Sequence, residues 1–174
     1  MVRRAQAGRT QRRWDRVLHQ IAVQLLGRLA LRRNELRLLN VGDFDMGRGT
    51  VRVHGKGGKI AVLPLGFKTL KRDLEVYLVG RGAGEYLLYP KDDTTHPMNP
   101  ASVHDWFKRC LKLAGLPPTI KMHALRHSAA DNLWRETGNL TMAQTLLRHE
   151  SPATTAQYLH PTRADLEAAL EALE

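Results

Sequence analysis

Six side chains of this 174-residue sequence are of the types that together could cleave a phosphodiester. They are Arg32, Lys56, His123, Arg126, His149 and Tyr158. Two guanidiniums can hold the non-bridging oxygens of a phosphate, where negative charge grows during nucleophilic attack. Histidine and lysine can move the protons of the nucleophile and of the leaving oxygen, and a tyrosine hydroxyl can bond covalently to phosphorus. Such a set of cations would need no metal ion.

Taken singly, each of these residues also has an ordinary structural interpretation. Arg32 is one of 27 Lys and Arg residues, Lys56 lies in a glycine-rich turn, and Tyr158 could be half-buried in a core. His123 and His127 have the spacing of a metal pair on a helix, but no third ligand follows at a suitable distance and the HExxH pattern is lacking. We therefore expect no metal and no cofactor, and the case for catalysis rests on the six residues together.

The composition indicates a basic globular domain. Hydrophobic residues make up 43%, and the single cysteine, Cys110, excludes an internal disulfide and a zinc site built from cysteines. No apolar run approaches the roughly 20 residues of a membrane span, and no secretory signal is recognisable, so we expect a cytoplasmic protein. The net charge of +10 favours polyanionic partners, of which nucleic acid is the commonest.

The charge is unevenly distributed. Residues 1–16 hold six arginines and one acid, whereas residues 164–174 hold four acids and no base. The basic segment is either a solvated arm or an arm that lies on DNA phosphates. The second interpretation makes its arginines DNA-binding residues, namely Arg3, Arg4, Arg9, Arg12 and Arg13. The acidic, leucine-spaced tail either folds back on the core or docks elsewhere.

Hydrophobic periodicity and capping signals predict a mainly α domain with a small antiparallel β-sheet, an α+β fold. Alternating residues on both sides of GKGG predict a β-hairpin over residues 50–65, in which Pro64 limits the second strand to an edge or an end. Residues 42–50 are predicted as a turn and residues 85–98 as a loop with a short extended piece. Helices are predicted over residues 14–31, 32–39, 67–79, 99–115, 121–138, 141–149, 151–159 and 161–173.

Four segments of the sequence carry a family resemblance. They are LALRRNELRLLNVGDFD, VRVHGKGGKIAVLPL, HALRHS and LLRHESPATTAQYLH. In this order they are similar to TGLRxxELxxLxWxDxD, the hairpin with its GKG, HxLRHS and LLGHxSxxTTxxYxH. The chain thus resembles the catalytic domain of the tyrosine recombinases, or phage-type integrases, over residues 17–162. The sequence departs from the pattern at two positions where the pattern has glycine. The first segment has Leu29–Ala30 in place of TG, and the last segment has Arg148 in place of the glycine of LLGH.

The resemblance implies a role for each matching residue. Tyr158 would be the nucleophile of a metal- and ATP-independent recombinase that forms a 3′-phosphotyrosyl link. Arg32, Arg126 and His149 would stabilise the phosphate, with Glu35 supporting Arg32. His123 would assist removal of the proton from the tyrosine, and Lys56 would protonate the leaving oxygen.

The resemblance also suggests partners and an organisation of the chain. The partners would be double-stranded DNA and further copies of the chain, which would form a tetramer on DNA and be a monomer in solution. The expected organisation is a basic arm over residues 1–16, a catalytic domain over residues 17–162 and a C-terminal helix over residues 163–174 that could dock in trans. Family members usually carry an additional N-terminal core-binding domain, so the chain is either a fragment or a minimal member.

Two other functions stay open from the sequence. A DNA-binding regulator could use the same domain with little activity, although it would need none of the catalytic residues. A relaxing enzyme of the type IB topoisomerase kind would use the same chemistry without pairing two sites. A helix-turn-helix protein would fit the composition but leave Lys56 and Tyr158 unexplained.

Overall fold

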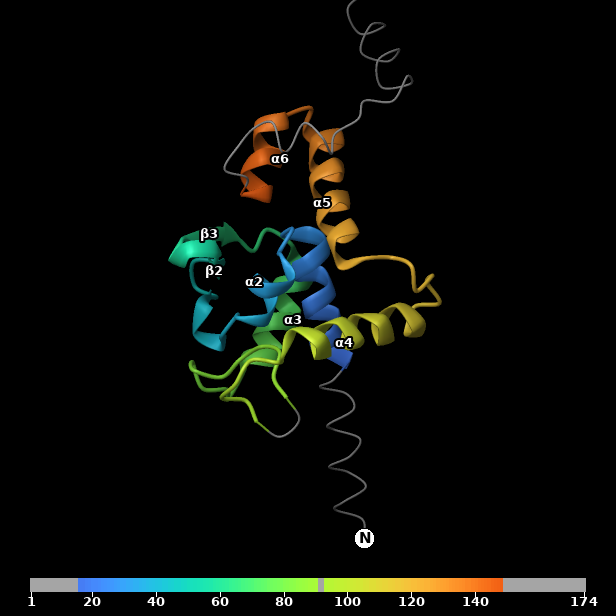
Figure 1. Ribbon diagram of the computed structural model, residues 1–174. Coiled ribbons are helices and arrows are strands. Elements are labelled where there is room, and N and C mark those ends of the chain that lie inside the picture. Colours follow the sequence, from blue (N-terminus) through green and yellow to red (C-terminus); the bar gives the residue numbers. More distant parts are fainter. Residues whose placement is uncertain (1–15, 91–92, 149–174) are drawn as a thin grey trace, which may run out of the picture. The chain divides into compact units, whose positions relative to one another are not determined.

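The computed structural model describes residues 16–90 and 93–148 (Figure 1). The predicted helices at 151–159 and 161–173, the basic arm, His149 and Tyr158 lie outside the described residues. The chain divides into two compact units, Met1–Ala129 and Ala130–Glu174, and each is described by itself. In the described part, no helix combines the length and the apolar character that crossing a membrane requires.

The first unit is a group of helices with a small sheet at one side (Figure 1). Its elements are a helix over residues 16–28, α2 (Arg33–Arg37), η1 (Val41–Asp43), β1 (Phe44–Asp45), β2 (Thr50–His54), η2 (Lys56–Gly58), β3 (Ile60–Pro64), α3 (Lys68–Leu78), α4 (Pro100–Leu113) and the start of α5 (Met122–Thr137). Leucines from five of these segments, together with Trp106 of α4, contribute to the core. Burial of these apolar side chains is the main force that holds the unit together.

The helix predicted over residues 14–31 ends earlier than expected. Its helical conformation stops at residue 28, and Ala30 has a φ of 52°. This left-handed conformation is unfavourable for a residue with a Cβ atom and cannot continue an α-helix. The family pattern has a glycine at this position, so the backbone keeps a conformation that glycine would adopt without strain.

The sheet is antiparallel, with the order β1-β2-β3. In the hairpin, Val51 pairs with Leu63 and both are buried, whereas Arg52 pairs with Val62 on the exposed face. Pro64 is the last residue of the edge strand β3, as predicted. The predicted turn at residues 42–50 was partly wrong, because it contains η1 and the two-residue strand β1.

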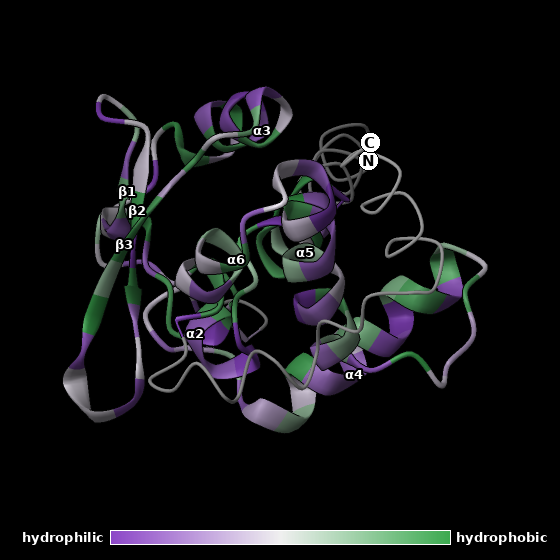
Figure 2. Ribbon diagram, turned by 90° about the horizontal axis from the view of Figure 1, so that it is seen from above, coloured by the Kyte–Doolittle hydropathy of each residue, from purple (hydrophilic) through white to green (hydrophobic). Residues whose placement is uncertain are grey.

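Helix α4 begins and ends where its capping residues predict. The Asn99 side chain accepts a hydrogen bond from the Ser102 backbone N–H at 2.8 Å, and Pro100 occupies the first turn. Beyond the last turn, Gly115 has a φ of 67°. Hydrophilic and hydrophobic residues alternate along the helix (Figure 2), and the apolar positions Val103, Phe107 and Leu111 are buried.

In the second unit, α5 ends before Gly138, which has a φ of 62°, and is followed by α6 (Leu140–Leu147). The Asn139 side chain caps α6 by accepting from the Met142 N–H at 3.1 Å. The cap at its other end, Arg148, has a φ of 50°. Ala30 and Arg148 are the two non-glycine residues with positive φ in the described part of the chain, and both stand where the family pattern has glycine.

We expect Arg148→Gly to raise the free energy of unfolding by about 1 kcal/mol, because glycine adopts this conformation without the steric cost of a Cβ atom. In a domain of this size the melting temperature should rise by roughly 2–4 °C. The matched control is Arg148→Ala, which loses the same side-chain hydrogen bond to the Leu146 carbonyl but keeps the Cβ atom. Thermal unfolding that ranks the alanine variant at or above the glycine variant would contradict this interpretation.

Candidate functional site

Arg32 is held at the start of α2 by a buried acid. The Glu35 side chain is 4% exposed, and its two oxygens accept from Arg32, one from the backbone N–H and one from Nη1, each at 2.7 Å. A buried carboxylate needs such partners, because removing it from water without them is costly. The rest of the guanidinium remains available, since the Arg32 side chain is 45% exposed. This contact is the one that a supporting acid would make.

Arg126 is almost entirely buried, with 1% exposure. Its Nη1 donates a hydrogen bond to the carbonyl oxygen of Ala30, which lies two residues before Arg32. The left-handed backbone of Ala30 thus presents its carbonyl oxygen to Arg126, just before the chain reaches Arg32.

Two histidines lie in the first turns of α5 beside the arginines. The rings of His123 and His127 meet edge to face, with centroids 4.3 Å apart. Partial burial, then the positive charges of Arg126 and Arg32, lower the pKa of His123 from its ordinary value of 6.5. Partial burial also lowers the pKa of His127, with contributions from His123 and Arg126. Both rings are therefore mainly neutral at pH 7 and can accept a proton.

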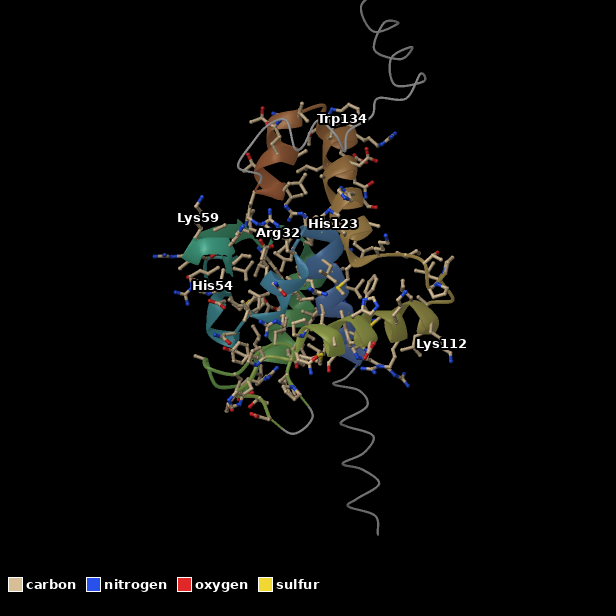
Figure 3. The ribbon with its side chains drawn as sticks, in the orientation of Figure 1. Arg32, His54, Lys59, Lys112, His123 and Trp134 are labelled. Atoms are coloured by element: carbon tan, nitrogen blue, oxygen red, sulfur yellow. The ribbon has the colours of Figure 1, made fainter. Side chains whose placement is uncertain are left out.

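Arg32 and His123 line the same cavity, which has a volume of about 940 Å³ (Figure 3). Its walls combine apolar side chains, including Phe107, with the cations Arg33 and Lys121. Within residues 16–90 and 93–148, no group of three or more His, Cys, Asp or Glu residues could hold a metal ion. The groups that the described residues offer around this cavity include the cations Arg32, Arg33 and Lys121 and the imidazole of His123.

Lys56 lies at a distance along the chain, at the exposed tip of the hairpin. Its turn uses two left-handed glycines, Gly57 with a φ of 72° and Gly58 with a φ of 76°, which explains the two glycines that follow Lys56. Among the described residues, no hydrogen bond or ion pair joins Lys56 to Arg32, His123 or Arg126. The structure therefore brings together four predicted residues, namely Arg32, Glu35, His123 and Arg126. It leaves Lys56 apart from them at the tip of the hairpin.

The remaining predicted residues lie outside the part of the chain that the structure describes. These are His149, Tyr158, Arg3, Arg4, Arg9, Arg12 and Arg13. Their assignments stay predictions.

The sequence analysis missed a contact between His54 and Asp43 beside the turn of the hairpin. Asp43 is 4% exposed, and its Oδ1 lies 2.9 Å from Nε2 of His54. Its Oδ2 accepts from the Asn40 N–H at 2.9 Å. A signal was present, because Asp43 is one of the two aspartates in the first quoted segment and His54 directly precedes the GKGG turn.

The family model described as the phage integrase family matches residues 5–165 of this chain. The chain belongs to the phage integrase family. It is 35% identical over 138 residues to tyrosine recombinase XerC of Proteus mirabilis, covering 75% of this chain and 43% of that protein. It is 33% identical over 159 residues to tyrosine recombinase XerD of Oceanobacillus iheyensis, covering 86% and 52%. The chain spans about half the length of the curated relatives it matches.

Two solved structures of recombinases have a similar fold. A crystal structure of XerA recombinase superposes with a TM-score of 0.73 at 22% identity, over 91% of this chain and 57% of that one. The XerH site-specific recombinase in its pre-cleavage complex with difH gives a TM-score of 0.66 at 25% identity, over 92% and 48%. These findings confirm the resemblance and the predicted fold class of this phage integrase family member.

We expect the lowered pKa of His123 to appear in an NMR titration of its ring protons, with a midpoint below 6.5. Arg32→Ala should raise this midpoint, because it removes one nearby positive charge. Lys112→Ala is the matched control, since Lys112 lies at the far end of α4 (Figure 3) and is not among the causes of the shift.

The same shift fixes the sign of the effect on stability. The unfolded chain binds more protons than the folded one between the lowered pKa and 6.5. The contribution of His123 to the free energy of unfolding is therefore present above pH 6.5 and lost as the pH falls. A titration midpoint at or above 6.5 would contradict the described environment of this ring.

Proposed function

We propose that this chain cleaves and rejoins DNA strands as a site-specific tyrosine recombinase. The observation that carries the proposal is the convergence of Arg32, held by buried Glu35, with Arg126, anchored on Ala30, next to His123. Paired guanidiniums beside a neutral imidazole suit an in-line attack on a phosphodiester, in which charge develops on the non-bridging oxygens. The relatives named tyrosine recombinase support the reaction class.

In the proposed reaction, Oη of Tyr158 bonds to phosphorus while the bond from phosphorus to the 5′-oxygen breaks. His123 assists removal of the tyrosine proton, for which its lowered pKa keeps the ring neutral at pH 7. Arg32 and Arg126 stabilise the phosphoryl oxygens together with His149, and Lys56 gives a proton to the leaving oxygen. Attack by a 5′-hydroxyl of a partner strand then reverses the step, so that strands are exchanged without ATP.

The proposed partner is double-stranded DNA. The net charge of +10 supports it, as does the XerH neighbour, whose structure was determined bound to difH. The proposal assigns residues 1–16 to a DNA-binding arm, residues 17–162 to the catalytic domain and residues 163–174 to a C-terminal helix that docks on a neighbouring copy. Strand exchange between two sites further requires a tetramer on DNA.

Covalent trapping tests the reaction class. We expect the chain, in EDTA, to form a DNA adduct on nicked duplexes that release a short 5′-hydroxyl strand, so that rejoining is blocked. Tyr158→Phe should abolish the adduct and spare DNA binding, because only the nucleophile is removed. Tyr86→Phe, at a half-buried tyrosine of the first unit, is the matched control and should keep the adduct. An adduct formed by Tyr158→Phe would reject the assignment.

The proposed role of the arm predicts the salt dependence of binding. Changing Arg3, Arg4, Arg9, Arg12 and Arg13 together to Gln should reduce the slope of log affinity against log salt by about 0.9 for each arginine that contacts a phosphate. Fluorescence anisotropy over a range of salt concentrations measures this slope. An unchanged slope would show that the arm is solvated and does not bind DNA.

A further inference from the structure

The orientation of Lys56 has to be set outside its own turn. Lys56, Gly57 and Gly58 are exposed, and glycines with positive φ leave the backbone conformationally free. At the base of the turn, Gly55 donates its N–H to the Lys59 carbonyl at 2.7 Å. That bond closes the hairpin but does not orient it relative to the rest of the unit.

One contact that ties the end of the hairpin to the rest of the unit is made by His54, the last residue of β2. Its Nε2 lies 2.9 Å from Oδ1 of Asp43, and the His54 side chain is 41% exposed. His54 precedes Lys56 by two residues, so rotation of the strand end about this contact would carry the lysine with it. Arg52 is less suited to this role, because its Nη2 lies 3.6 Å from the same carboxylate and 2.8 Å from the Gly42 carbonyl, which it binds.

Asp43 is a fixed anchor for this contact. It is 4% exposed, and its second oxygen accepts from the backbone N–H of Asn40. Glu35 makes the same arrangement eight residues earlier, since one of its oxygens accepts from a backbone N–H three residues before it and the other binds the Arg32 side chain. The same device thus occurs twice, and in the first case the side chain that it holds is a proposed catalytic residue.

We propose that His54 is a positioning residue, which by binding Asp43 orients the hairpin so that Lys56 reaches the leaving 5′-oxygen. The inference rests on the proposed function and assigns a role to a residue outside the six matched to the family pattern. His54 itself does not contact DNA in this scheme. Its loss should impair protonation of the leaving group and leave attack by Tyr158 unaffected.

A DNA substrate with sulfur in place of the bridging 5′-oxygen separates these two steps. When the bond from phosphorus to this sulfur breaks, the thiolate leaves without a proton, because thiols ionise with a pKa of about 8.5. A variant that is impaired only in proton donation should therefore cleave the sulfur substrate at the wild-type rate. A defect in folding, DNA binding or nucleophilic attack slows both substrates.

The experiment measures adduct formation by the full chain on matched oxygen and sulfur substrates. We expect the His54→Ala variant to cleave the oxygen substrate about tenfold more slowly or worse, because it would lose part of the effect of a general acid. The same variant should cleave the sulfur substrate at the wild-type rate. Lys56→Ala should show the same pattern. His54→Gln should stay close to wild type on both substrates, because its amide nitrogen can donate to Asp43 from the place of Nε2.

Arg52→Gln is the matched control, on the same strand face and near the same carboxylate. It should leave the ratio of the two rates unchanged, because it lies further from the turn. Equal slowing of both substrates by His54→Ala, or no slowing of either, would overturn the role of His54 alone. Absence of a wild-type adduct on both substrates would overturn the proposed function, and this inference with it.

Discussion

The hydrogen bond from buried Arg126 to the carbonyl oxygen of Ala30 is the interaction on which the arrangement of the site depends. A guanidinium at 1% exposure has to be bound to acceptors, because leaving it unpaired away from water is prohibitively costly. The acceptor is available because the chain leaves the first helix in a left-handed conformation at residue 30. The backbone turn at Ala30 therefore ends the first helix and binds the side chain of Arg126. It also begins the segment that carries Arg32.

Two buried acids extend this arrangement toward the sheet. Glu35 and Asp43 each accept from a backbone N–H at the start of a short helix, which fixes the carboxylate and leaves its other oxygen to bind a side chain. Glu35 uses that oxygen for Arg32, and Asp43 uses it for His54. The short helices α2 and η1 thereby place one buried carboxylate beside Arg32 and the other beside His54.

The elements that the sequence predicted well are those with strong local signals. The Asn99–Pro100 start of α4, the glycines that follow α4 and α5, and the alternation around GKGG each determine a boundary through steric or hydrogen-bonding requirements of a few neighbouring residues. The errors occurred where local preference and the fold disagree. Alanine favours a helix, so the end at residue 28 was missed, and strand β1 has two residues, too few to show periodicity.

The sequence by itself determined the residue types, their order, the family resemblance and most of the helices and strands, because these depend on side-chain chemistry and on spacing along the chain. The tertiary structure alone decided which groups meet. Arg126 and Ala30 are 96 residues apart, and His54 and Asp43 are joined across the end of a strand. Such contacts depend on how the core leucines pack the segments together, and burial then lowers the pKa of His123, which spacing along a helix cannot reveal.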